Sequence, residues 1–178
     1  MFIRAKKIKK HLYAYAVKNK WTKKGSRQKI VGYLGRVHKF EPVKDINFEL
    51  FLKKDMDQYF EKTKPKKIIK DYIGFELHKH GFEKASSEKA SWIKGDFQVD
   101  LNKLSIKKGA SDTVIHMNND FFCNLTLKKL INFRSKSDQE ECGRELAKAF
   151  ITAGISVQSE VFVEVFRKIF REGDVSYV

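Results

Sequence analysis

The first forty residues contain no aspartate or glutamate, and the first acidic side chain of the chain is Glu41. The sequence is also poor in helix and strand breakers, with two prolines and ten glycines in 178 residues, which excludes a low-complexity or disordered chain. Its two cysteines, Cys123 and Cys142, stand apart without a CxxC spacing. We expect both to be small buried apolar residues in a reducing compartment, without a zinc or redox role.

Long apolar runs are missing as well. None approaches the length of about 18 residues that crosses a bilayer, and the N-terminus lacks the apolar stretch of a signal peptide. We therefore expect a cytoplasmic protein without a membrane partner. The glycine pair in residues 32–36 is not followed by a helix start, so it is not a phosphate-binding loop, and no cofactor is expected.

Positive charge is what the sequence has in excess, and it is concentrated at one end. The first forty residues carry thirteen lysines and arginines, so +13 of the formal net charge of +15 lies in less than a quarter of the chain. Charge packed in this way repels itself, and a polyanion relieves the repulsion because each neutralised phosphate also releases a counterion. Nucleic acid is therefore the expected partner.

The basic segment has the pattern of three short strands, at about residues 2–8, 12–18 and 27–37. In the second strand Tyr13 and Tyr15 alternate with alanines. In the third strand, strict alternation places Lys29 and Tyr33 on one face and Ile30 on the other. An isolated three-stranded ribbon is marginally stable, so we expect one face to dock on the rest of the chain and the other to present lysines and tyrosines.

The remaining residues predict an α+β domain. Helical periodicity covers about residues 47–62 and then a second helix with an apolar stripe at Ile69, Tyr72, Ile73 and Leu77. Residues 85–90 read as a loop, and residues 97–117 alternate with a period of two, which predicts two or three strands. Three helices follow, the second opened by a capping box at residues 137–140. The chain thus divides into a basic three-stranded β-meander, 1–40, and a domain, 41–178, with a helical middle, a short β segment and three C-terminal helices.

The meander interleaves aromatic and basic side chains. Lysine and arginine contact phosphates, and a planar side chain beside them stacks on an unpaired base. The candidate nucleic-acid-binding residues are Arg4, Lys6, Tyr13, Tyr15, Lys18, Lys20, Trp21, Lys23, Lys24, Arg27, Lys29, Tyr33 and Arg36. Nothing in these strands selects a groove, so RNA, including ribosomal RNA, fits as well as DNA.

Four pieces of the meander also carry a resemblance to a known family. They are Phe-Ile-Arg at 2–4, Tyr-Ala-Tyr at 13–15, Arg-Gln-Lys at 27–29 and Tyr-Leu-Gly-Arg at 33–36. This series, over about 37 residues, resembles the N-terminal region of insertion-sequence transposases of the DDE class. It is also similar to the opening of short archaeal proteins of unknown role. The resemblance implies contact with nucleic acid.

The resemblance does not extend to catalysis. A DDE transposase needs three carboxylates that hold two metal ions, and only 138 residues follow the meander here. Asp96, Asp100 and Asp120 are the acidic residues near predicted strands, and we interpret them as turn and strand-end residues. His78 and His80 stand two apart on a predicted helix, so they cannot chelate one ion, and we expect them at the surface. We therefore expect no metal site and no enzyme, and keep a truncated transposase-like nuclease as an alternative.

The last predicted helix has a wide apolar stripe. We expect this stripe to pack in the core. A homodimer seam is the alternative, because Phe162, Phe166 and Phe170 extend the stripe beyond what one small domain usually covers. This gives a further alternative for function. The protein would be a ribosome-associated or oligomerising assembly factor, in which these phenylalanines pair two chains or bind a protein while the basic segment binds RNA.

Overall fold

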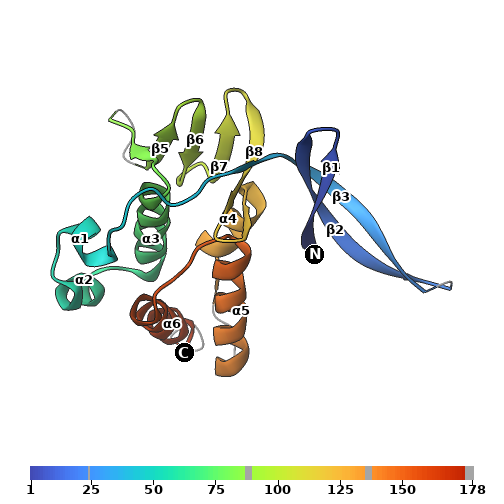
Figure 1. Ribbon diagram of the computed structural model, residues 1–178. Coiled ribbons are helices and arrows are strands. Elements are labelled where there is room, and N and C mark those ends of the chain that lie inside the picture. The colour runs from blue at the N-terminus through green and yellow to red at the C-terminus, as the bar shows by residue number, and fades with distance from the viewer. Residues whose placement is uncertain (24, 87–89, 135–137, 175–178) are drawn as a thin grey trace.

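The computed structural model describes residues 1–23, 25–86, 90–134 and 138–174 (Figure 1). The strands are β1 (Phe2–Ile8), β2 (His11–Thr22), β3 (Gly25–Lys39), β4 (Glu83–Lys84), β5 (Ser91–Lys94), β6 (Phe97–Asp100), β7 (Ser105–Lys108), β8 (Ser111–Met117) and β9 (Asp120–Phe122). The helices are α1 (Phe48–Leu52), α2 (Met56–Lys62), α3 (Pro65–Lys79), α4 (Asn124–Ile131), α5 (Gln139–Thr152) and α6 (Ser159–Asp174). The mixture of helices and strands confirms the predicted α+β class.

The strands form one continuous sheet in the order β1-β2-β3-β8-β7-β6-β5-β4, with β9 paired to β8. Neighbouring strands are antiparallel except β3 and β8, which run parallel where Arg36–Lys39 lie against Thr113–His116. Figure 1 shows the helices on one side of β5–β8, and the β2–β3 hairpin extending away from them. The ribbon of β1, β2 and β3 is therefore joined to the body of the protein through a single strand pair.

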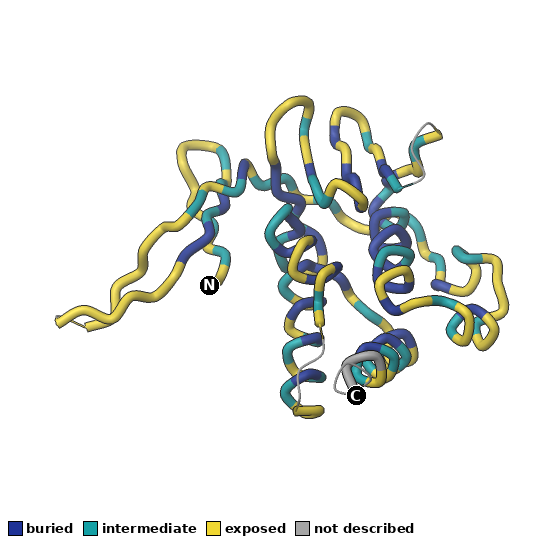
Figure 2. The backbone as a smooth tube through the Cα atoms, turned by 180° about the vertical axis from the view of Figure 1, so that it is seen from behind, coloured by how far each residue is buried: buried dark blue, intermediate teal, exposed yellow. Residues whose placement is uncertain are grey.

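The main core lies in the body. Apolar side chains of α3, α4, α5 and α6 pack against the strands β5–β9, and the predicted stripe Ile69, Tyr72, Ile73 and Leu77 is buried in α3. A second, smaller cluster lies under the ribbon and consists of Ala14, Val114 and Cys123 with partly buried neighbours. Figure 2 shows the contrast, because buried residues gather in the body while the far end of the hairpin is exposed.

The predicted helix over 47–62 is wrong in one respect, since the structure divides it into α1 and α2. Lys53 adopts a left-handed conformation with φ of 53° and ends α1. The side chain of Asp55 then accepts a hydrogen bond from the backbone N–H of Gln58 and begins α2. A left-handed residue ends one helix, and an aspartate cap begins the next. The spacing of apolar residues alone does not reveal either signal. The two or three strands predicted over residues 97–117 are present as β6, β7 and β8, and the short strands β5 and β9 on either side were not predicted.

The three predicted C-terminal helices are confirmed as α4, α5 and α6. Asp138 caps α5, where its side chain accepts from the backbone N–H of Glu141 at 2.5 Å. Ser137, the first residue of the predicted capping box, lies outside the described residues. Cys123 and Cys142 are both buried and free of a disulfide, as expected. Among the residues that the structure describes, no helix combines the length and apolar character needed to cross a membrane.

A buried polar bridge ties α3 to the turn between β8 and β9. The carboxylate of Glu76, fully buried, accepts from the side-chain amide of Asn118 at 2.6 Å and lies 3.2 Å from the Lys79 ammonium. Asn118 also donates to the carbonyl of Gly154, at the end of α5, at 2.9 Å. His80 follows directly and is buried, so the prediction of a surface position for it was wrong. The end of α3 is packed under the sheet, and the His80 Nδ1 atom lies 2.8 Å from the Glu76 carbonyl oxygen.

Candidate nucleic-acid interface

The ribbon presents two different faces, which follow from its strand register. Partners across two strands share a face, and the pairs Tyr13–Arg36 and Tyr15–Tyr33 place these side chains together. The pairs Lys18–Lys29 and Lys20–Arg27 lie on the opposite face, because residues 15 and 18 of one strand point to opposite sides. The prediction that Lys29 and Tyr33 share a face was therefore wrong. Of the two register shifts, each of which adds one residue to β3, the one at Val31 lies between them and reverses the alternation.

The outer part of the hairpin is exposed on both faces. We call residues 18–31, without residue 24, the arm, and every one of them is solvent-exposed. Within the described part of the chain, no further strand lies beside the arm. The pairing of β2 with β1 ends at Val17 and Phe2, and the pairing of β3 with β8 ends at Arg36 and Thr113. The prediction that one face of the ribbon docks holds for its base only. The side chains of a two-stranded hairpin that extends into solvent do not pack in a core, so they are available to contact a partner.

Four cations stand opposite one another on the arm. Lys18 faces Lys29 and Lys20 faces Arg27 across the two strands, and we call these four residues the cationic quartet. Side chains directly opposite in such a pair have Cβ atoms about 5 Å apart, and like charges there destabilise the hairpin. No carboxylate exists in the first forty residues to offset this repulsion. The quartet therefore costs stability in the free protein, and an anion bound along the arm relieves it.

Tyrosines cluster on the other face, at the base of the ribbon. The ring centroid of Tyr33 lies 5.5 Å from that of Tyr15 and 6.3 Å from that of Tyr13. Tyr33 is 59% exposed. Partial burial, with Tyr13 and Tyr15 adding to it, raises the pKa of Tyr33, so its phenol stays neutral at physiological pH. Arg4, Lys6 and Arg36 pair with the cluster across the strands. Planar rings edged by cations make a surface on which unpaired bases stack while phosphates are neutralised.

The remaining predicted residues lie towards the tip. Trp21 is 81% exposed and pairs with Ser26, which places it on the same side of the hairpin as the tyrosines. Lys23 is exposed in the turn, and Lys24 lies outside the described residues. On the same face, Arg4 donates to the side-chain carbonyl of Gln28 at 2.6 Å and so links β1 to the arm. An indole this exposed gains nothing from the core, and its position suits base stacking.

The base of the ribbon is held at a close crossing of β3 and β8. Gly35 has φ of +125°, and a Cβ atom there would lie 2.6 Å from the carbonyl oxygen of Asp112. The Thr113 hydroxyl donates to the carbonyl of Arg36 at 2.9 Å. His38, two residues on, packs edge-on against Phe97 at 5.0 Å, and burial followed by Lys108 and Arg36 lowers its pKa. Only glycine allows this approach, which fixes where the ribbon leaves the body.

A groove of about 900 Å³ lies beside the ribbon, and sequence reasoning missed it. It runs between the start of β1 and the helices α4 and α5, with Phe2 and Phe121 in its wall. Its cations are Lys128, Lys129, Arg134 and Lys148, against the carboxylates Asp120 and Glu145. The pair Lys128-Lys129 between two buried leucines was the available signal, because it marks the solvent side of α4. The positive surface thus continues from the ribbon onto the body.

The acidic residues near strands have local roles. Asp96 lies 3.6 Å from the Lys108 ammonium, Asp100 accepts from the backbone N–H groups of Asn102 and Lys103, and Asp120 accepts from its neighbour Phe121. Burial opposes the change, but these backbone hydrogen bonds lower the pKa of Asp100. Within the described ranges, no three His, Cys, Asp or Glu side chains gather as a metal ion would require.

This distribution leads to a prediction about cleavage. Labelled duplex, hairpin and single strands, incubated with the protein and magnesium or manganese, should remain intact, because two-metal hydrolysis needs carboxylates that converge on one site. Gel electrophoresis over time measures it. Cleavage that disappears in Asp96→Ala or Asp120→Ala, while circular dichroism shows a retained fold, would restore the nuclease alternative.

The apolar stripe of α6 is only partly covered. Val161, Val165 and Ile169 are buried, while the rings of Phe162, Phe166 and Phe170 are partly exposed and stack along the helix at 6.4 and 6.0 Å. Phe166 also lies over Gly143 of α5, where an added Cβ would be 3.5 Å from its ring. The stripe therefore serves the core of one chain at least in part.

A homodimer through the exposed part of this stripe stays a prediction. Sedimentation should show a dimer whose mass does not change with salt, since an apolar contact is not screened. Phe166→Asp should dissociate it and lower the free energy of unfolding, because an unpaired charge in an apolar contact is costly. A monomer that the same substitution merely destabilises would assign the whole stripe to the core.

The fold and the site together define an α+β protein with a projecting basic ribbon whose two faces differ in chemistry. Comparison of the chain with protein-family models, with curated proteins and with solved structures gave no match. What the ribbon binds is therefore inferred from its own residues.

Proposed function

We propose that the protein binds nucleic acid without cleaving it, through the phosphate backbone and with little reading of base edges. The cationic quartet carries this proposal. Two directly opposed pairs of like charges cost hairpin stability, and the sequence offers no carboxylate nearby to reduce that cost. Charged side chains, lysine above all, also protect exposed strand edges from aggregation, but that role does not require like charges directly opposite each other. A single sign on an exposed arm is instead what a polyanion selects.

The tyrosine cluster supports single-stranded or unpaired nucleic acid as the preferred form. Tyr13, Tyr15 and Tyr33 present rings on one face of a ribbon, whereas reading a duplex requires an element that enters a groove with Arg, Asn or Gln aimed at base edges. RNA is the ligand class that most often offers splayed bases in loops and ends. The resemblance of residues 1–37 to a transposase N-terminal region supports nucleic acid in general. The two buried cysteines, which are not joined in a disulfide, support a reducing, cytoplasmic location.

Salt dependence tests the proposal directly. Fluorescence anisotropy of a labelled single-stranded oligonucleotide, repeated at several salt concentrations, should give a straight line of log K against log salt. With four to six phosphate contacts the slope should be about −3 to −5, because each contact contributes about 0.7 to 0.9. A slope near zero would show that phosphates are not what the ribbon recognises.

Tyr33→Leu should weaken single-strand binding by about fivefold to a hundredfold, since one stacked base contributes about 1 to 3 kcal/mol. Duplex binding should change much less, because paired bases do not stack on the ribbon. Tyr33→Phe is the matched control, which keeps the ring and should keep the affinity. Equal losses on single strand and duplex would contradict stacking and leave only the backbone contacts.

A further inference from the structure

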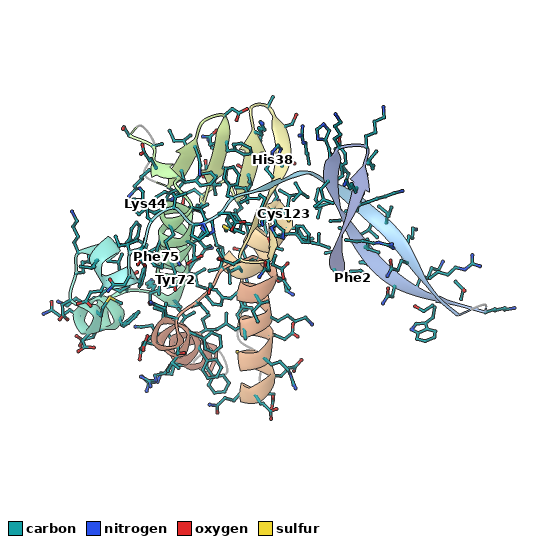
Figure 3. The ribbon with its side chains drawn as sticks, in the orientation of Figure 1. Phe2, His38, Lys44, Tyr72, Phe75 and Cys123 are labelled. Atoms are coloured by element: carbon teal, nitrogen blue, oxygen red, sulfur yellow. The ribbon has the colours of Figure 1, made fainter. Side chains whose placement is uncertain are left out.

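A second basic pocket lies at the end of the sheet opposite the ribbon. It has a volume of about 880 Å³ and is formed by residues 44–46, α1, α3, β4 and β5, with Leu101 and Asn102 closing it. In the sheet order the ribbon strands stand at one end and β5 and β4 at the other. Figure 3 shows the same separation, with Lys44 of the pocket far from Phe2 of the ribbon. We call this cavity the α3 pocket. Its volume is that of an ordinary small-molecule site.

Aromatic rings form one wall of the α3 pocket. Phe51 of α1 lies 5.4 Å from the imidazole of His78 and 6.1 Å from the indole of Trp92, measured between ring centroids. Phe51 and His78 are both partly exposed, and Trp92 packs behind them at 7% exposure. Gly74 of α3 makes room for the indole, because a Cβ atom there would lie 2.5 Å from it. The wall is therefore built of packed aromatic rings, with Phe51 tilted by 43° from His78 and by 32° from Trp92, and all three residues line the pocket.

Lysines form the rim. Six of them line the pocket against two carboxylates, Asp71 and Glu83, and they are Lys44, Lys53, Lys54, Lys67, Lys70 and Lys84. Lys67 is paired with Asp71, and Lys70 donates to the side-chain carbonyl of Asn102 at 2.7 Å. Lys53 and Lys84 are exposed and make no ion pair with any residue that the structure describes. The domain as a whole is almost neutral, so a local excess of four cations is a feature of this site.

Burial and the positive charge of nearby lysines lower the pKa values of two groups in the pocket, Lys70 and His78. Burial, followed by the charges of Lys66 and Lys67, lowers the pKa of Lys70, although Asp100 opposes the change. Burial and the nearby Lys44 ammonium, 3.4 Å from both ring nitrogens, lower the pKa of His78. The lowered pKa favours the neutral form of the His78 imidazole in this positively charged, partly buried site. An anion entering the pocket meets the half-buried Lys44 and Lys70, whose charges water screens less completely than those of the exposed rim lysines.

An aromatic wall beside a cationic rim matches a ligand that carries both an aromatic base and a phosphate. We propose that the α3 pocket binds a nucleotide unit, with the base against Phe51 and His78 and the phosphate among the rim lysines. Lysine binds phosphate as a point charge and does not need the fork geometry of arginine. The unit belongs either to a free nucleotide or to a strand of nucleic acid. This site does not depend on the proposed role of the ribbon, because the two share no residue.

The two tryptophans of the chain give a direct test. In a Trp21→Phe background, Trp92 is the only indole and lies behind the wall. Titration with AMP should change its fluorescence saturably, whereas adenosine alone and inorganic phosphate alone should each bind at least about tenfold more weakly, since stacking and charge act together. AMP that binds no better than phosphate would overturn the proposal.

Paired variants locate the site. Lys53→Gln with Lys84→Gln should weaken AMP binding by about tenfold or more at low salt, whereas Lys64→Gln with Lys107→Gln removes the same charge elsewhere and should leave it unchanged. Phe51→Leu should weaken AMP by about fivefold and leave inorganic phosphate unaffected. Equal effects of the two lysine pairs would show general electrostatics and no pocket. The lysine pairs keep the test valid if Phe51→Leu fails to fold.

The same Trp92 fluorescence assay distinguishes a free nucleotide from a strand of nucleic acid as the ligand. A single-stranded octanucleotide that changes Trp92 fluorescence even when the cationic quartet is replaced by glutamine would place a strand in the pocket. AMP binding without any response to the octanucleotide would identify a free nucleotide. Loss of AMP binding in the quartet variant would overturn the α3 pocket and leave the ribbon as the nucleotide site. Loss of octanucleotide affinity alone in that variant concerns the ribbon only.

Discussion

Glutamine at all four positions of the cationic quartet is expected to lower the affinity for a single strand by about ten-thousandfold at 50 mM salt, because each of the four lost phosphate contacts removes about a factor of ten there. The slope of log K against log salt should flatten by about 3. The free energy of unfolding should stay the same or rise, since the substitutions remove two opposed like-charge pairs, Lys18–Lys29 and Lys20–Arg27. Anisotropy titrations and urea unfolding measure the two quantities.

A matched variant separates the position of the charge from its amount. Glutamine at Lys62, Lys64, Lys66 and Lys107 removes the same four charges from exposed sites in the body. It should reduce affinity only slightly. If both quadruple variants lose affinity equally, the ribbon is not the binding surface and net charge alone attracts the nucleic acid.

Gly35→Ala is expected to destabilise the protein by about 3 kcal/mol or more, because it combines a forbidden backbone conformation with an overpacked contact. The new Cβ would meet the Asp112 carbonyl oxygen at 2.6 Å and the Thr113 Cα at 2.8 Å. The strand crossing has to open to accommodate it, so amide exchange should increase at Arg36–Lys39 and Thr113–His116. Thermal unfolding and hydrogen exchange check both effects.

Gly32→Ala is the control in the same strand. No heavy atom lies within 4 Å of the Cβ position at Gly32, and its φ is outside the positive region. Alanine there should leave stability unchanged or raise it slightly, since the unfolded chain loses freedom. Equal destabilisation by the two substitutions would mean that β3 tolerates no side chain at either glycine, and that the crossing is not special.

The sequence predicted most of the helices, because amphipathic spacing is a local property. The stripe from Ile69 to Leu77 is buried in α3, and α4 to α6 follow in the expected order. The break between α1 and α2 escaped prediction, since Lys53 adopts a left-handed conformation that no residue type announces. The pairing of β3 with β8 was equally out of reach. Nothing in either strand alone specifies a partner so far away along the chain.

For the candidate site, the sequence predicted which basic and aromatic residues form the ribbon, but not which of its two faces each of them occupies. One extra residue in β3, Val31, shifts the register between Tyr33 and Lys29, so Lys29 lies opposite Lys18 and on the other face from Tyr33. Strict alternation cannot detect such bulges. The α3 pocket was missed for another reason: its lysines come from distant segments, such as Lys44 and Lys84, and the domain is nearly neutral in sum. A cluster of charges that forms only when distant segments fold together cannot be recognised from the composition of the domain.

The parallel pair of β3 and β8 has a consequence for the order of folding. The Thr113–Arg36 hydrogen bond spans 77 residues, whereas β2 and β3 are joined by a short turn. Closing a long loop is slow compared with forming a hairpin, because chain entropy must be spent before the distant contact forms. The contacts of the hairpin can therefore form transiently while the body is still unfolded, whereas the strand crossing at Gly35 needs distant segments and closes later. A nascent chain would in this way expose its most basic segment to a polyanion before its own core is complete.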